Sequence, residues 1–221
     1  MNENLKKIHE YLIELGSEEK ELLYMDQHSV KLAMEICEYA HRNQKRENGE
    51  DYANHPARIL KSYRDLVGII EGDPFCIDVD LLYHYNVPFD GVQEVCLLHD
   101  VIEDTEFTLE DVRNIYVDCG FESFFDMYIN NALQCITHDK SMEYEPYIEI
   151  CLKNPISALV KMLDLQDNLR IIDLVELNHE NYDRSMRYVT YLYWIDSKYH
   201  FLENIQKYKE DFATPKQEEE N

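Results

Sequence analysis

Apolar residues recur at intervals of three and four along most of the chain, which is the spacing of one face of an α-helix. Between residues 28 and 46, for example, Val30, Ala33, Met34 and Cys37 fall on a single face. The same spacing predicts helices over the ranges 3–15, 19–25, 28–46, 56–71, 91–104, 122–137, 143–153, 155–178 and 180–210.

Capping residues and turn formers mark several boundaries between these helices. Thr108 is followed three residues later by Asp111, which is the signature of a capping box at the start of a helix. Residues 47–52 predict a loop, and residues 72–90, with two prolines and several aromatic side chains, predict an irregular segment that contains a short helix. Residues 79–83 have the residue types of a strand, but the segment is short and isolated, so we expect no strand there.

The predicted fold class is therefore all-α. A chain of 221 residues with 45% hydrophobic residues can bury a full core in one domain, and only six glycines and six prolines indicate few tight turns. We expect a helical extension over residues 1–27, a core over 28–178, a C-terminal helix packed on that core over 179–211, and a flexible acidic tail over 212–221.

Charge and cysteine usage restrict the partners and the compartment. The formal net charge of −24 repels nucleic-acid backbones and anionic membranes, so we expect neither as a partner. The six cysteines are scattered without a CxxC pair, as free thiols in a reducing compartment are. The first 20 residues show no apolar signal core, and no run reaches membrane-spanning length. We expect a cytoplasmic protein, either a monomer or a homodimer, whose tyrosine-rich last helix serves core packing or a dimer face.

One short stretch, CLLHDVIEDT at 96–105, changes from apolar to strongly polar within a few residues. On a helix, His99 and Glu103 lie one turn apart, and Asp100 and Asp104 form the adjacent row. Two such rows can direct metal ligands and an acid or base group to one point. A solvated helix end with a satisfied histidine is the competing interpretation.

Two further residues favour a metal site. A hard or borderline divalent cation takes mixed imidazole and carboxylate ligands, and His99 and Asp100 supply two of them. His55 lies at a loop-to-helix junction and is a third candidate, and Asp164 is a fourth, although an acid in such a helix is often only a salt-bridged surface residue. Glu103 could accept or orient the proton of a metal-activated water. Such ligands suit Mn²⁺, Fe²⁺, Zn²⁺ or Mg²⁺.

A cationic stretch lies next to His55. Between residues 41 and 64, six basic residues stand against three acids, in a chain that is otherwise strongly acidic. The stretch is either a solvated face or a binding site for phosphate groups. Its basic residues are Arg42, Lys45, Arg46, Arg58, Lys61 and Arg64.

Three blocks of the sequence resemble the HD-domain (p)ppGpp hydrolases, which are the hydrolase domains of Rel/SpoT enzymes and the stand-alone Mesh-type or small alarmone hydrolases. The blocks are AHRNQKRENGEDYANHP at 40–56, LLHDVIEDT at 97–105 and VKMLDLQDNLR at 160–170. They follow the order of that family and cover roughly residues 28–175. No segment resembles the synthetase domain that accompanies the hydrolase domain in the longer enzymes.

The resemblance implies an all-helical HD-domain bundle, an HD phosphohydrolase core over 28–178, and one metal ion, which is usually Mn²⁺ in this family. The metal ligands that it implies are His55, His99, Asp100 and Asp164. It makes Glu103 and Asp104 the catalytic acids and places Arg46 against the nucleotide base. The full set of expected substrate-binding residues is Lys45, Arg46, Tyr52, Thr137, Lys161 and Asn168.

The implied reaction is attack of water on the 3′-pyrophosphate of a guanosine nucleotide, ppGpp or pppGpp, a small anionic substrate. Several positions depart from the family pattern. His99 lies 44 positions after His55, a longer interval than expected, and the extra segment 72–90 forms either a lid or specificity wall or a packed surface excursion. Glu47 and His138 stand where basic residues are usual, which weakens the positive pocket.

These departures leave two alternative functions open. The first is an HD phosphohydrolase that acts on a different nucleotide or small phosphoester. The second is a nucleotide-binding regulatory protein with little turnover. The Glu103-Asp104 pair argues against the second, because a sensor does not need a water-activating acid.

Overall fold

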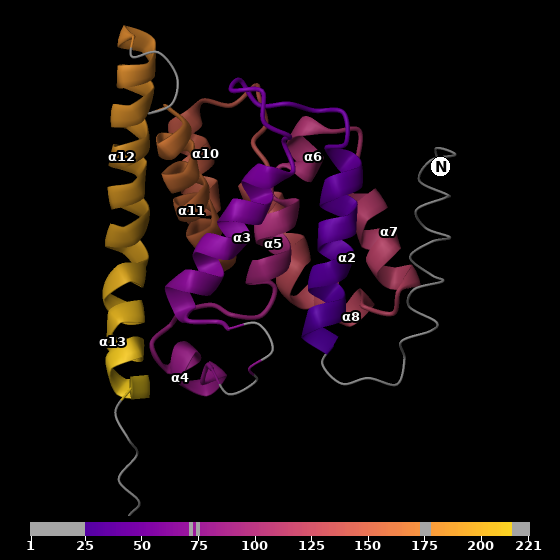
Figure 1. Cartoon of the computed structure of the whole chain (residues 1–221), viewed down its shortest axis with the longest axis vertical. Helices are drawn as coiled ribbons and strands as arrows, with labels where there is room; N and C mark the ends of the chain where they lie inside the picture. The colour runs from indigo at the N-terminus through magenta and orange to yellow at the C-terminus, as the bar shows by residue number, and fades with distance from the viewer. Residues whose placement is uncertain (1–24, 71–72, 74–75, 173–177, 214–221) are drawn as a thin grey trace, which may run out of the picture.

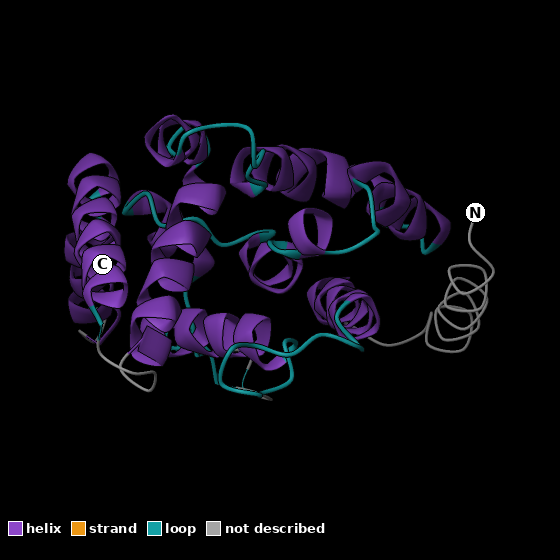
Figure 2. Ribbon diagram, turned by 90° about the horizontal axis from the view of Figure 1, so that it is seen from above, coloured by secondary structure: helices purple, strands orange, loops and turns teal. Residues whose placement is uncertain are grey.

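The structure is a computed structural model that describes residues 25–70, 73, 76–172 and 178–213. These residues form a bundle of helices, and no strand occurs among them, which confirms the predicted all-α class (Figures 1 and 2). In chain order the elements are α2 (Met25–Ala40), α3 (Asn54–Val67), α4 (Val79–His84), α5 (Val92–Leu98), α6 (Val101–Asp104), α7 (Leu109–Asp118), α8 (Glu122–Phe124), the π-helical turn η1 (Phe125–Ile129), α9 (Asn130–Ile136), α10 (Tyr144–Cys151), α11 (Pro155–Ile172), α12 (His179–Tyr199) and α13 (Phe201–Ala213).

Two helices, α5 and α11, form the centre of the bundle. α5 contacts α2, α3 and α11, and nearly every one of its residues is buried. In α11 the run from 156 to 165 is buried without interruption, so this part of the helix is enclosed on all sides by other elements. Figure 1 shows α3 and α5 between α2 and α11. Polar residues on these two helices are therefore held in the interior.

The predicted helix over 28–46 is too long at its C-terminal end. α2 stops at Ala40, and the chain then forms turns in which the backbone of Lys45 pairs with that of Asp51 in an isolated bridge. The hydrogen bond from the backbone of Arg46 to Glu50, at 2.9 Å, closes this loop. The polar sequence of the loop cannot extend the apolar face of α2, so the helix ends where burial ends.

The predicted helix over 91–104 is interrupted at its centre. α5 ends at Leu98, His99 and Asp100 form a turn, and α6 starts at Val101. In an unbroken helix the two side chains would point about 100° apart. The turn lets them converge instead, with His99 Nε2 3.1 Å from Asp100 Oδ2.

The predicted helix over 180–210 is also two helices. His200 adopts a left-handed conformation, with φ 54°, that ends α12, and α13 starts at Phe201. A left-handed residue is a common way to end a helix. The aromatic residues of this region are divided: Tyr208 is buried, Tyr191 and Trp194 pack partly against the core, and Tyr193 is exposed.

The described residues 76–90 of the predicted irregular segment pack near the C-terminal end of α3, away from His55 at its start (Figure 1). α4, which forms part of it, contacts α13, and Asp78 donates its backbone N–H to the Tyr208 hydroxyl at 3.3 Å. Leu82 and Val87 are in the core. The short helix is confirmed, since α4 covers the strand-like residues 79–83, and the location of the described residues matches the packed excursion rather than a lid over His55.

Other predictions on local structure have clear outcomes. Thr108 and Asp111 form the expected capping box, and all six cysteines are free thiols. Among the described helices, none combines the length and the apolar character needed to cross a membrane. The predicted helices over 3–15 and most of 19–25 lie outside the described residues, and the domain boundaries stay predictions.

Gly91 offers a test of how the start of α5 is fixed. Its φ is 78°, and a Cβ atom there would lie 2.7 Å from the Cβ of Tyr128 in η1. Gly91→Ala should therefore lower the free energy of unfolding by about 1–3 kcal/mol for the left-handed backbone alone, plus the cost of the clash. Gly68→Ala is the matched control, because Gly68 has φ 90° but no atom within 4 Å of the added methyl. Equal losses in urea melts of the two variants would contradict the close packing of η1 on α5.

Candidate functional site

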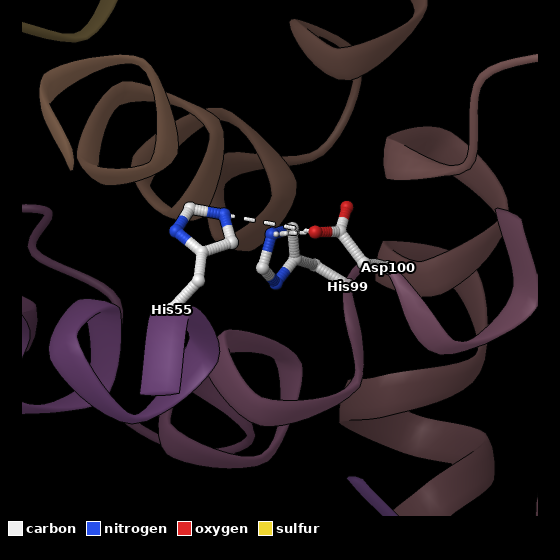
Figure 3. A group of neighbouring side chains, drawn as sticks. All are labelled: His55, His99 and Asp100. Carbon is white, nitrogen blue, oxygen red and sulfur yellow. Dashed lines mark ion pairs between the residues drawn. The ribbon is translucent and has the colours of Figure 1, made fainter. Parts of the chain in front are cut away.

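Four predicted ligand residues converge in the interior from three helices. His55 comes from the first turn of α3, His99 and Asp100 from the turn after α5, and Asp164 from the buried part of α11. His55 Nε2 lies 3.1 Å from Asp164 Oδ1 and 3.6 Å from Asp100 Oδ2. His99 Nε2 lies 3.1 Å from Asp100 Oδ2 and 3.8 Å from Asp164 Oδ1. Figure 3 shows the two imidazoles and Asp100 facing one another.

Hydrogen bonds at the other ring nitrogens define the tautomers of the two histidines. His99 Nδ1 lies 3.0 Å from the carbonyl oxygen of Cys96, and His55 Nδ1 lies 2.7 Å from Asp167 Oδ2. A carbonyl oxygen and a carboxylate oxygen can only accept, so both Nδ1 atoms donate. Each Nε2 faces the carboxylates of Asp100 and Asp164 and becomes a ligand atom when a binding cation displaces any proton that it carries.

This arrangement fits a divalent cation. His99 Nε2 is buried, makes no hydrogen bond of good geometry among the described residues, and has the carboxylates of Asp100 and Asp164 as its polar neighbours. Ligand atoms about 2.1 Å from a shared cation lie about 3.0–3.4 Å from one another, close to the separations of these four side chains. Ligand atoms of His55, His99 and Asp100 all lie within 4.8 Å of one another. Two imidazole nitrogens and two carboxylate oxygens are the mixed donor set that such a cation prefers.

The charges of the site are strongly coupled. Burial would lower the pKa of His99, but Asp100 and then Asp164 raise it to about 9. Burial would likewise raise the pKa of Asp100, yet His99 holds it below its usual value. Lys161 lowers the pKa of Asp164 in the same way, through a 2.7 Å contact between Lys161 Nζ and Asp164 Oδ2. The carboxylates are therefore ionised and available to a cation.

Glu103 and Asp104 follow the ligands on α6. Glu103 Oε2 accepts the backbone N–H of His138 at 3.0 Å, and burial raises the pKa of this carboxyl. Asp104 Oδ1 lies 3.1 Å from Lys140 Nζ. The Tyr52 hydroxyl lies 2.8 Å from Asp100 Oδ2 and 3.0 Å from Asp104 Oδ2, so it links a candidate ligand to a candidate catalytic acid.

A pocket of about 230 Å³ has among its lining residues Tyr52 and Asn168, which bind the candidate ligands Asp100 and Asp164. Asn168 connects the pocket to the candidate ligands, because it donates to Asp164 Oδ1 at 2.6 Å and accepts from Arg46 Nη2 at 2.5 Å. Arg46 Nη1 and Arg184 Nε are buried and have no hydrogen-bond partner among the described residues. The lining residues are Lys45, Arg46, Glu47, Tyr52, Asn168, Arg184 and Tyr188.

Not all expected substrate-binding residues line this pocket. Lys45, Arg46, Tyr52 and Asn168 do, but Lys161 is buried against Asp164 and the rings of two tyrosines. Thr137 donates its hydroxyl to the carbonyl of Leu133 at 2.8 Å, at the end of α9.

The basic stretch contributes only in part, because four of its six members are engaged elsewhere. Arg42 contacts Glu106, Lys61 pairs with Asp65, and Arg64 donates to Gln93. Arg58 is bound to Glu50 and Asp167.

The structure adds site residues that the sequence reasoning missed. Arg184 and Tyr188 reach the pocket from α12, outside the three resembling blocks, so only the packing of α12 on α11 reveals them. Asp167 lies one turn after Asp164 on α11, and that spacing on one helix face was a usable signal. Lys140 supplies a cation near Asp104, whereas the His138 ring packs on that of Tyr147 at 4.4 Å.

Asp167 is an ionised carboxylate in a buried position. Its Oδ1 accepts Arg58 Nε at 2.8 Å, and its Oδ2 accepts Arg58 Nη2 at 2.9 Å as well as the His55 ring. Burial would raise the pKa of Asp167, but the bonds from His55 and Arg58 hold it below the usual value.

Comparisons with known proteins point to one group of enzymes, although no family model matches the chain. Guanosine-3′,5′-bis(diphosphate) 3′-pyrophosphohydrolase MESH1 of Drosophila melanogaster is 29% identical over 147 residues, which are 62% of this chain and 67% of that protein. The mouse (Mus musculus) protein of the same name is 27% identical over 171 residues, 71% of this chain and 72% of that protein. A GTP pyrophosphokinase of Streptomyces coelicolor is 26% identical over 147 residues, 64% of this chain but only 14% of that longer protein.

A solved structure supports the same fold. It is described as a metazoan orthologue of SpoT that hydrolyses ppGpp, and it matches with a TM-score of 0.50 and 19% identity over 87% of this chain and 99% of the other. The chain is therefore similar in sequence to the MESH1 pyrophosphohydrolases and shares the all-helical fold of the SpoT orthologue.

Proposed function

We propose that the chain is a metal-dependent HD phosphohydrolase that hydrolyses the 3′-pyrophosphate of guanosine alarmones such as ppGpp and pppGpp. The observation that carries this proposal is the convergence of His55, His99, Asp100 and Asp164 beside a pocket lined by arginines. The relatives named as ppGpp 3′-pyrophosphohydrolases support the choice of substrate.

The proposed cofactor is one divalent cation held by the four converging side chains. When bound, such a cation polarises phosphoryl oxygens and lowers the pKa of water. The resemblance to the alarmone hydrolases favours Mn²⁺, while the donor set also suits Fe²⁺, Zn²⁺ and Mg²⁺. The six free cysteines are consistent with a reducing, cytoplasmic site of action.

Glu103 is the proposed general base. Its carboxylate is half-buried, and the resulting rise in its pKa makes it a stronger base than an exposed glutamate. The hydrogen bond from the His138 backbone holds one oxygen in place and leaves the other free to accept a proton. Asp104, bound to Lys140 and Tyr52, orients the attacking water from the neighbouring position.

The pocket holds the nucleotide in the proposed complex. Arg46 binds Asn168, which in turn binds the candidate ligand Asp164. A nucleotide bound by the Arg46 guanidinium therefore has its reacting phosphate held at a fixed distance from the candidate ligands. The unpartnered nitrogens of Arg46 and Arg184 suit an anionic or acceptor-rich ligand. Binding there keeps the pyrophosphate next to Glu103 throughout the reaction.

One observation favours the alternative substrate class. Glu47 lines the pocket and lies 3.8 Å from Arg184, so part of the positive charge of the pocket is already neutralised. A nucleotide with fewer phosphates than ppGpp would suffer less repulsion from Glu47. The second candidate function is therefore hydrolysis of another nucleotide or small phosphoester at the same site.

A substrate panel tests the proposed function. The protein loaded with Mn²⁺ is assayed with ppGpp, pppGpp, GTP and cyclic nucleotides, and we expect pyrophosphate release from ppGpp that stops when the metal is chelated. Arg46→Ala should raise KM for ppGpp about 10- to 100-fold, since a charged hydrogen bond contributes about 1.5–3 kcal/mol. Arg170→Ala, an exposed arginine on the same helix as Asn168, is the control. Turnover of another nucleotide but not of ppGpp would replace the main proposal by the second candidate.

Replacing the proposed base separates catalysis from metal binding. Glu103→Gln keeps the shape of the side chain but cannot accept a proton, so we expect kcat to fall by about 10²–10⁴-fold with an unchanged Mn²⁺ stoichiometry. Glu106→Gln serves as the matched control, because Glu106 is exposed and its ion pair with Arg42 is long, at 3.9 Å. A kcat of Glu103→Gln within twofold of wild type would remove Glu103 from the mechanism.

A further inference from the structure

Asp167 is a buried charge next to, but outside, the set of candidate ligands. Its side chain is 3% exposed, and it lies on α11 one turn after Asp164. Its two oxygens accept three hydrogen bonds, two from Arg58 and one from His55 Nδ1. A buried carboxylate is costly unless it is paired and hydrogen-bonded, and these bonds satisfy it fully.

The orientation of His55 depends on this contact rather than on its own helix. α3 begins at Asn54 with Ala53 at the N-cap position, no side chain caps it, and no acid occurs in its first turn. The partner of His55 Nδ1 comes instead from α11, where Asp167 Oδ2 lies 2.7 Å from this nitrogen.

We propose that Asp167 is the positioning residue of the candidate metal centre, which keeps the proton of His55 on Nδ1 and directs the bare Nε2 towards Asp100 and Asp164. This inference rests on the proposed function, because it assigns a role within the same site. A partner that accepts the N–H of the second ring nitrogen fixes the tautomer of a ligand histidine and raises the basicity of the other nitrogen. Asp167 performs both tasks for His55.

The two candidate histidine ligands are oriented by different devices. His99 uses the backbone carbonyl of Cys96 within its own turn. His55 uses a charged side chain from another helix, so the geometry of its Nε2 depends on the packing of α3 against α11. Only the His55 orientation can therefore be changed by substituting a side chain at a distance from the ligands.

Arg58 fixes the carboxylate in turn. It lies one turn after His55 on α3, donates from Nε and Nη2 to Asp167, and pairs through Nη1 with Glu50 in the loop that carries Arg46. The planar guanidinium holds both carboxylate oxygens in one orientation, which a flexible lysine would not do. Arg46 Nη1 also lies 3.8 Å from Asp167 Oδ2. The carboxylate thus ties the candidate metal ligand to the pocket arginine.

The test is a set of Mn²⁺ affinities measured by calorimetry on the full chain. Asp167→Asn should raise the dissociation constant about 10- to 100-fold, the usual effect of losing such a partner. The amide has one acceptor oxygen and one NH2 group, so its NH2 group would face an N–H donor of Arg58 or His55. Asp65→Asn is the matched control, since it is the same change in an exposed ion pair on α3, and its affinity should equal that of wild type.

A spectroscopic measurement distinguishes positioning from a merely structural role. In the protein loaded with diamagnetic Zn²⁺, the Nδ1–H proton of His55 should give a downfield NMR signal that exchanges slowly with water. The signal should disappear in Asp167→Asn while that of His99 remains. If Asp167→Asn fails to fold, Arg58→Gln takes its place, with an expected loss of Mn²⁺ affinity of about tenfold.

The outcomes separate this inference from the proposed function. Absence of Mn²⁺ binding by wild type, or full binding by Asp164→Ala, overturns the metal centre itself. The metal centre stands if wild type binds Mn²⁺ and Asp164→Ala loses binding. In that case, an Asp167→Asn affinity within twofold of wild type, or an unchanged His55 signal, overturns only the positioning role. If Arg58→Gln is used instead, an Mn²⁺ affinity equal to that of wild type also overturns the positioning role.

Discussion

The interaction on which the structure depends is the attraction between two buried carboxylates and two buried imidazoles at the meeting point of three helices. Asp100 and Asp164 are both held near the same pair of ring nitrogens, where their mutual repulsion would be severe in an apolar interior. Protein groups compensate much of that charge: Lys161 pairs with Asp164, and the Tyr52 hydroxyl binds Asp100. A divalent cation would complete the compensation.

The helices are arranged so that this polar cluster has a rigid apolar frame. α5 and α11 are buried on nearly all sides. α5 ends just before the candidate ligands His99 and Asp100, and α11 carries the candidate ligand Asp164 in its buried part. The short turn at His99 and Asp100 separates α5 from α6 and carries two of the candidate ligands at the end of the buried helix. α12 packs on α11 and adds Arg184 to the pocket beside that cluster.

The sequence marks the four candidate ligands, which the structure brings together, because each lies in a block with strong local constraints. His99 and Asp100 follow an apolar run, and His55 stands before Pro56 at a helix start. The break after Leu98 could not be predicted, because the apolar spacing continues through the buried Val101.

Long-range contacts account for the remaining differences. Lys161 was expected in the pocket, but its pairing with Asp164 draws it into the core. Arg184 enters the site only through the packing of α12 on α11, which no local pattern encodes. His200 has no sequence feature that marks a left-handed residue, so the last two helices read as one. Asp167 had a signal in its spacing from Asp164, but its partners on α3 are distant in sequence.

The most direct test of the four-ligand site is X-ray diffraction from crystals grown with Mn²⁺, recorded at the manganese absorption edge. Anomalous scattering locates the metal without reference to activity. The account predicts one strong peak within coordination distance of His55 Nε2, His99 Nε2, Asp100 and Asp164, at about 2.0–2.2 Å from nitrogen and oxygen ligands. A peak elsewhere on the acidic surface, with these four side chains free of metal, would contradict it.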